Sequence, residues 1–287
     1  MQRPGSRKRT SQRQKVSTPT HSWLNFTPLT LQPAFWIDAS DSSTITVTSG
    51  RISEWRDKSG NARHLTQTDA ARRPVVQAAH QNGMDTVLFD GTRMMTTTTA
   101  ASVWTFLHDG TSYIIAGMIR VGTGAALSRN VTICGTSHLG AAVGTIGMRQ
   151  IRLLTATRLT NSVYNNTSTQ VASTSSTLST GFVENEYWNY AFFMQPNEAV
   201  ADRIKLAWRW SDLGNVNDTA VTGGSPVSTA PNNSFCVGAA INDTNPAWNQ
   251  LIGYIGEMII VSGANATVEN RALLLEYLRR KWMVYPA

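Results

Sequence analysis

Residues 204–210 read IKLAWRW, and this stretch indicates the fold class more clearly than any other. Its apolar side chains are Ile204, Leu206, Trp208 and Trp210, and the residues between them are Lys205, Ala207 and Arg209. A period of two places one face of a β-strand on a core and the other face toward water. The stretch therefore predicts a strand that is buried on one side.

Other runs of strand length continue along the chain. They are rich in β-branched and aromatic residues and bounded by Gly, Asn or Asp, as strands usually are. The longer runs are 113–121, 187–194, 235–241 and 253–261, and the shorter ones are 45–48, 52–55, 86–89, 131–134 and 148–154. Many short strands without alternating helices predict an all-β fold, an antiparallel sandwich of two sheets.

Two further segments have a pattern of their own. Segment 160–180 is rich in Ser, Thr and Asn, and is either a loop or a solvent-facing hairpin, which Ser and Thr in sheets favour. Between Thr267 and Val284 the spacing is helical, with apolar side chains at Val268, Ala272, Leu275, Leu278 and Trp282. Thr267 or Asn265 is the expected N-cap of this helix, and Arg279, Arg280 and Lys281 lie near the negative end of its dipole.

The charge of the chain is concentrated at its N-terminus. The chain carries 25 basic and 18 acidic residues, a formal net charge of +7. Residues 1–20 contain no acid and six basic side chains, which are Arg3, Arg7, Lys8, Arg9, Arg13 and Lys15. So polar a segment buries too little surface to offset the entropy cost of ordering. We therefore predict a flexible basic arm over residues 1–30 and one folded domain over residues 31–287.

Composition restricts the class of protein further. The chain has 287 residues, of which 41% are hydrophobic and 15% charged, so we expect a soluble globular protein. No apolar stretch approaches the roughly 20 residues that a membrane-spanning helix needs, and the arm lacks the apolar segment of a secretory signal. Cys134 and Cys236 form no C-x-x-C pair, which excludes a disulfide scaffold and a thiolate zinc site. Two buried free thiols are the expectation.

Short motifs stand at both ends of the predicted domain. Near its start are LQPAFWIDASD at 31–41, GRISEWRDKSGNARHL at 50–65 and VLFDG at 87–91, and near its end are GYIGEMIIVSG at 253–263 and YLRRKW at 277–282. In order and spacing, these motifs resemble the opening and ending of laminin-G-like domains of the concanavalin A-like lectin/glucanase superfamily. The resemblance implies a two-sheet jelly roll over residues 31–285, of the kind found in bacteriophage structural proteins and bacterial surface proteins. Because this fold hosts lectins, hydrolases and inert structural modules, it does not decide the function.

The residues that carry the resemblance also have a direct physical interpretation. Trp36 and Trp55 are large apolar groups at strand positions, which favours burial in a core over a ligand platform. Asp38, Asp41 and Asp57 stand beside Ser or Lys at strand ends, where carboxylates accept hydrogen bonds from nearby backbone N–H groups and form turns. Their spacing does not converge in the way that a calcium site requires, so no metal site is predicted.

Enzyme signatures are absent or incomplete. Glu184 and Glu186 would share one face of a strand, as the paired acids of a retaining glycosidase do, but the run of three acids found in the glucanases of the superfamily is interrupted. The glycine-rich stretch at 122–124 lacks the third glycine of a dinucleotide loop, and the five histidines are isolated. We therefore predict a protein that is not an enzyme, with no catalytic residues and no cofactor.

One loop has the composition of a carbohydrate site. It lies between two late strands and contains Asn242, Asp243, Asn245, Trp248 and Asn249. An aromatic face can stack on a sugar ring while amides and carboxylates beside it bind the hydroxyls. The alternative is an ordinary turn with an anchored tryptophan, because turns use the same Asn, Asp and Pro residues.

These observations lead to two main hypotheses of function. In the first, the chain is a non-enzymatic virion protein of a tailed phage, displayed on the particle surface as a capsid decoration or appendage and attached to capsid or other virion proteins through its basic arm. In the second, it is an adhesin or tail-fibre module that recognises host polysaccharide. We expect a homo-oligomer and no membrane partner. Contact of the arm with nucleic acid is a less favoured alternative, because the arm has no aromatic residue to stack on bases.

Overall fold

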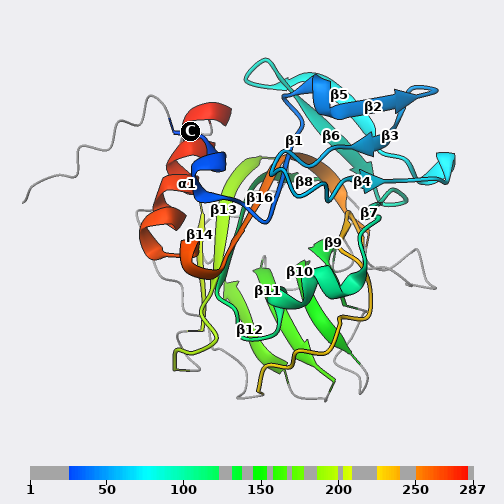
Figure 1. Cartoon of the computed structure of the whole chain (residues 1–287). Coiled ribbons are helices and arrows are strands. Elements are labelled where there is room, and N and C mark those ends of the chain that lie inside the picture. Colours follow the sequence, from blue (N-terminus) through cyan, green and yellow to red (C-terminus); the bar gives the residue numbers. More distant parts are fainter. Residues whose placement is uncertain are drawn as a thin grey trace, which may run out of the picture.

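The structure is a computed structural model, and it describes residues 26–122, 131–137, 145–153, 158–166, 170–177, 186–199, 203–208, 225–239 and 250–283. Within these residues the strands form two antiparallel sheets, one of seven strands and one of nine (Figure 1). The seven-stranded sheet consists of β1 (Phe35–Asp38), β5 (Val75–Gln81), β6 (Met84–Asp90), β8 (Tyr113–Val121), β13 (Tyr187–Met194), β14 (Ile204–Trp208) and β16 (Ile252–Ser262). This confirms the predicted all-β sandwich.

The nine-stranded sheet is built mostly from shorter strands. They are β2 (Ile45–Thr48), β3 (Arg51–Trp55), β4 (Leu65–Thr66), β7 (Met95–Thr97), β9 (Val131–Gly135), β10 (Ile146–Leu153), β11 (Arg158–Asn165), β12 (Gln170–Thr177) and β15 (Cys236–Val237). Strands β11 and β12 pair antiparallel from Arg158 opposite Thr177 onward, so the Ser/Thr-rich segment forms paired strands and not a loop. The expectation that it faces solvent is wrong for β11, whose residues 160–165 are buried. Of the predicted strand 235–241, only Cys236–Val237 is a strand among the described residues.

Alternation along the strands produces the main core between the sheets. Ile115 and Ile119 of β8 face inward and meet inward residues of the other sheet, such as Trp55 and Ile133, and all of these side chains are fully buried. An aliphatic or aromatic side chain contributes about 1.5–3 kcal/mol when it leaves water in this way. Trp55 is therefore a core residue, as its strand position predicts.

The outer face of the seven-stranded sheet is covered by the helix α1 (Val268–Trp282). Outward residues Ile114, Ala116 and Met118 of β8 form a second apolar cluster with Leu274, Leu278 and Trp282 of the helix. The helix begins as the sequence predicts, because the side chain of Thr267 accepts a hydrogen bond from the backbone N–H of Asn270 at 3.2 Å. None of the described helices is long and apolar enough to cross a membrane.

One buried carboxylate ties α1 to the sheet. Glu257 of β16 has no exposed surface and accepts four hydrogen bonds. The donors are Trp36 Nε1 at 2.7 Å, Tyr277 Oη at 2.9 Å, Lys281 Nζ at 2.8 Å and Trp282 Nε1 at 2.8 Å. Trp36 is thus buried beneath the helix, as predicted, and its indole N–H holds Glu257 in place.

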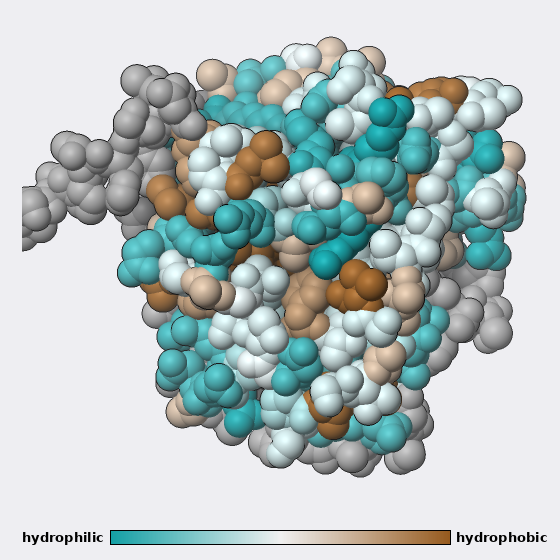
Figure 2. All heavy atoms as spheres, in the orientation of Figure 1, coloured by the Kyte–Doolittle hydropathy of each residue, from teal (hydrophilic) through white to brown (hydrophobic). Residues whose placement is uncertain are grey.

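The short 3₁₀ helices lie in the connections between strands. They are η2 (Pro28–Leu31), η3 (Ser42–Thr44), η4 (Ala70–Arg72), η5 (Ala101–Leu107) and η9 (Gly263–Asn265). Large apolar side chains that remain exposed are few and scattered among the described residues: Leu29, Val47, Val268 and Met283. The face seen in Figure 2 is accordingly polar over most of its area, with separate small apolar patches. This distribution gives no indication of a broad apolar docking surface.

Candidate ligand-binding site

Strands β4 and β7 place a group of polar side chains on the outer face of the nine-stranded sheet. The two strands pair antiparallel, with Leu65 opposite Thr97 and Thr66 opposite Thr96. Leu65 and Met95 enter the core and are fully buried. Because successive side chains of a strand point to opposite faces, Thr66 and Thr96 point away from the core.

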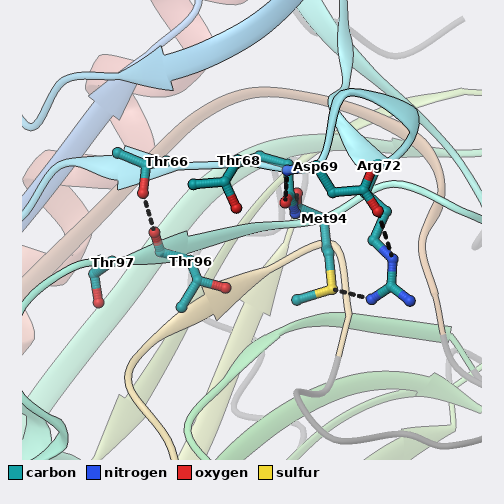
Figure 3. A pocket seen from close by; sticks show the side chains of 8 residues that line it. Thr66, Thr68, Asp69, Arg72, Met94, Thr96 and Thr97 are labelled. Atoms are coloured by element: carbon teal, nitrogen blue, oxygen red, sulfur yellow. Dashed lines mark hydrogen bonds and ion pairs between the residues drawn. The ribbon is translucent and has the colours of Figure 1, made fainter.

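A pocket of about 350 Å³ opens at this position (Figure 3). Its lining residues come from the end of β4, the following loop, η4 and the start of β7. They are Thr66, Gln67, Thr68, Asp69, Arg72, Met94, Thr96 and Thr97. The lining therefore combines hydroxyl groups, an amide, a carboxylate and a guanidinium with the apolar side chain of Met94.

Hydrogen bonds hold the loop that forms one wall of the pocket. Gln67 Nε2 donates to the Met94 carbonyl at 2.9 Å, which links the two sides of the pocket. Arg73 donates from Nε to the Gln67 carbonyl at 2.8 Å and from the second guanidinium nitrogen to the Thr68 carbonyl at 3.2 Å. Asp69 caps η4 by accepting from the backbone N–H of Ala71 at 2.9 Å. These hydrogen bonds within the protein hold the wall in place.

Two charged side chains line this pocket, and both are half exposed. Arg72 Nε lies 3.6 Å from Asp69 Oδ2, and their side chains are 52% and 55% exposed. The Arg72 guanidinium also contacts the sulfur of Met94 at 3.9 Å (Figure 3). An exposed ion pair of this length contributes about 0–1 kcal/mol. Arg72 can therefore exchange this partner for a ligand at little cost.

The lining chemistry suits binding better than catalysis. All eight lining residues lie in the described range 26–122, and among them Asp69 is the one carboxylate. Hydrolysis of a glycosidic bond ordinarily requires two carboxyl groups that flank it. Threonine hydroxyls, an amide and a carboxylate can instead donate to and accept from the hydroxyl groups of a sugar.

The acids near the start of the domain form turns, as predicted. Asp38, Asp41 and Asp57 each accept from the backbone N–H of the serine two residues later, which are Ser40, Ser43 and Ser59, at 3.1, 3.2 and 2.9 Å. Asp38 and Asp41 also contact Lys58 Nζ, at 2.9 and 2.8 Å. Among the described residues no group of three or more His, Cys, Asp or Glu side chains could hold a metal ion.

The site residues expected from the sequence lie elsewhere. The arm residues Arg3, Arg7, Lys8, Arg9, Arg13 and Lys15 fall outside the described residues, as do the loop residues Asn242, Asp243, Asn245, Trp248 and Asn249. Glu184 also falls outside them, whereas Glu186 is described and half buried just before β13. The structure therefore tests neither the predicted docking arm nor the predicted carbohydrate loop.

Sequence reasoning missed the pocket, although its residues carry a weak signal. The segments TQTDAARR at 66–73 and MMTTTT at 94–99 are both rich in Thr. Nothing in either segment shows that Thr66 lies opposite Thr96, because strand register depends on tertiary pairing. A search for hydroxyl-rich segments at the ends of short strands would have found both.

The chain matches no protein-family model and no curated protein. Solved structures match it in fold. The binding domain of botulinum neurotoxin serotype D is 10% identical, with a TM-score of 0.53 over 88% of this chain and 53% of that one. The binding domain of Paraclostridial Mosquitocidal Protein 1 is 13% identical, with a TM-score of 0.55 over the same shares.

This likeness shows a shared fold, a jelly-roll-like β-sandwich, and the chain spans about half the length of these two structures. The alginate lyase Aly36B also matches, at 14% identity and a TM-score of 0.42, over 80% of this chain and 97% of that one. That score is too low to support an inference about activity.

Proposed function

We propose that this protein is a non-enzymatic glycan-binding domain, and that the pocket between β4 and β7 receives a sugar residue. The observation that carries the proposal is the lining of the pocket. Hydroxyl, amide, carboxylate and guanidinium groups converge on a cavity of about 350 Å³ that opens on the outer face of the sandwich. Polar groups that converge on one cavity can fix the orientation of a small ligand by hydrogen bonds.

The nature of the polar groups favours a sugar over an apolar ligand. Thr66, Thr68 and Thr96 line the pocket with hydroxyl groups, which can pair with the hydroxyls of a pyranose. The Thr66 hydroxyl also donates to the Thr96 carbonyl at 3.5 Å, and the Thr96 side chain also bonds the Cys236 thiol, so a sugar would share or replace these contacts. Met94 supplies an apolar contact for the C–H face of the ring. The two matched toxin structures are binding domains by name, which agrees with a binding role for this sandwich. The loop with Trp248 remains a predicted additional contact.

Filling the pocket tests this proposal. The full chain would be screened on a glycan array, and the affinity for the best glycan measured for the Thr96→Trp variant. The indole should occupy the cavity and weaken binding by about tenfold or more, which corresponds to about 1.4 kcal/mol. Thr48→Trp is the control, because Thr48 is exposed on β2 of the same sheet and does not line the pocket.

Two results would overturn the assignment. One is the absence of binding to every glycan on the array by the wild-type chain. The other is unchanged affinity in Thr96→Trp when its thermal unfolding matches that of the Thr48→Trp control.

We also propose that the chain acts as a phage virion protein, attached to capsid or other particle components by its basic arm. The feature that supports this proposal is the charge of residues 1–20, which hold six basic side chains and no acid. Phe26 packs edge-on against Tyr277 of α1, with ring centroids 5.8 Å apart. Helix α1 covers the outer face of one sheet, whereas the pocket opens on the outer face of the other. Figure 1 shows α1 and β4 at opposite sides of the molecule.

Deletion of residues 1–20 tests the attachment. Assembled particles should lack the truncated chain, while its glycan binding and thermal unfolding should equal those of the full chain. Substituting Arg7, Lys8 and Arg9 by Gln should reduce incorporation in part. Incorporation of the truncated chain at normal copy number would refute the role of the arm and leave the glycan proposal intact.

A further inference from the structure

The surroundings of the pocket carry more positive than negative charge. Arg51, Arg72 and Arg73 lie at its loop, and of these three Arg72 alone pairs with Asp69. Arg51 donates to the Arg73 carbonyl at 3.4 Å, and Arg73 donates to the carbonyls of Gln67 and Thr68. Within the part of the chain that the structure describes, neither Arg51 nor Arg73 contacts a carboxylate.

This surplus is local. Outside the arm, residues 21–287 hold 19 basic and 18 acidic side chains, so the folded domain is close to neutral as a whole. Carbonyl partners satisfy guanidinium N–H groups but leave their positive charge uncompensated. Charges within about 10 Å of one another still interact at moderate ionic strength. Arg51, Arg72 and Arg73 therefore give the loop side of the pocket an excess of positive charge, and Glu54, which lies opposite Thr66, is paired with Arg56 at 3.4 Å.

The Arg72 side chain lines the pocket and can contact a ligand there directly. Its guanidinium lines the pocket, is half exposed, and is held by a long ion pair to Asp69 at 3.6 Å and a sulfur contact at 3.9 Å. A guanidinium binds a carboxylate or sulfate through parallel N–H donors, which gives orientation as well as energy. Neither existing contact of Arg72 offers that geometry.

We infer that the pocket selects an anionic sugar, one that carries a carboxylate or a sulfate group, and that Arg72 binds this group. The inference rests on the glycan-binding function proposed above and names the class of glycan. Arg51 and Arg73 strengthen the attraction from beside the loop, without touching the ligand. The negative charge of Asp69 opposes this attraction.

The test uses two pairs of polymers that differ in charge. Polygalacturonate is compared with its fully methyl-esterified form, and dextran sulfate with dextran, which separates carboxylate from sulfate recognition. The full chain should bind at least one acidic polymer about tenfold more tightly than its neutral partner. The Arg72→Gln variant should lose most of this preference and keep only the weaker attraction that Arg51 and Arg73 exert on the acidic polymer. Asp69→Asn should raise the affinity for the acidic polymer.

Arg280→Gln is the matched control. Arg280 is 49% exposed and pairs with Glu276 on α1, so it resembles Arg72 in exposure and pairing but lies on the opposite face. The Arg280→Gln variant should bind all four polymers with the affinity of the wild-type chain. Equal wild-type affinity for acidic and neutral polymers would overturn the inference, and so would equal losses in Arg72→Gln and Arg280→Gln, which indicate general charge attraction. Binding of neutral glycans alone overturns this inference and leaves the glycan-binding function standing.

Discussion

At the scale of single residues, Glu257 shows how a buried charge is accommodated. It lies directly opposite Asp38 in the pairing of β16 with β1, and Lys281 Nζ contacts both carboxylates, at 2.8 and 2.7 Å. Burial raises the pKa of Glu257, although the charge of Lys281 opposes this. Burial also acts to raise the pKa of Asp38, but the charge and hydrogen bond of Lys281 and the charge of Lys58 outweigh it and lower the value. The positive charge of Lys281 thus compensates the negative charge of both carboxylates.

The Glu257→Ala variant should therefore be strongly destabilised. It leaves two indole N–H groups, a phenol and the Lys281 ammonium without their shared acceptor. Loss of one member of a buried ion pair costs about 3–5 kcal/mol, which a urea unfolding curve would report. Glu276→Ala is the comparison, because Glu276 forms partly exposed ion pairs with Arg279 and Arg280 on the helix surface and should cost below about 1 kcal/mol. Equal losses in the two variants would contradict a special role for Glu257.

The residue scale also shows a limit of sequence reasoning. The burial of Trp36 follows from its size and strand position, and the turn made by Asp38 follows from Ser40 two residues later. The partner of the Trp36 indole, Glu257, lies 221 residues away. No local pattern contains that pairing, because it arises only when β1 pairs with β16.

At the scale of elements, apolar runs predict the two long strands and helical spacing predicts the helix. β8 and β13 run over Tyr113–Val121 and Tyr187–Met194, which are the predicted limits, and α1 begins after the predicted cap Thr267. The two strands are recognised by their length, their β-branched and aromatic residues and the residues that bound them.

The same reasoning does not predict the short strands β4 and β7. β4 has two residues and β7 has three, and both exist because their neighbours in the nine-stranded sheet supply hydrogen-bond partners. The candidate site depends on these two strands. The sequence shows the residue types of the candidate site. It does not show that they lie close together, because about 30 residues separate the two sides of the pocket and only the register of β4 with β7 brings them side by side.

The docking of α1 gives a prediction at this scale. Gly256 lies under the Trp282 ring, and a Cβ at that position would be 2.8 Å from Trp282 Cη2 and closer still to the end of Met118. The Gly256→Ala variant should push Trp282 outward and cost about 1–3 kcal/mol. Urea unfolding followed by tryptophan fluorescence would measure both effects. In Gly122→Ala, where the nearest atom is an Ile252 methyl at 3.2 Å, the loss should be smaller. The reverse order would show that Trp282 does not pack against Gly256.

At the scale of the whole molecule, the two sheets separate the face covered by α1 from the face on which the pocket opens. The chain enters its described part beside α1 on one outer face, and the polar pocket opens on the other. The main core lies between the sheets and contains the large aromatic residues Trp55, Trp104 and Phe235. Phe26 and the polar pocket thus lie at opposite outer faces of the sandwich.

The two native cysteines give this sandwich a practical property. Cys134 and Cys236 are unpaired and fully buried, and burial raises the pKa of Cys134 well above its ordinary value and that of Cys236 to about 12. Maleimide reagents react with thiolates, so neither native thiol should react with them in the folded chain. A cysteine engineered at the rim of the pocket or in the arm would then take up a fluorophore or spin label selectively, with no need for a cysteine-free background.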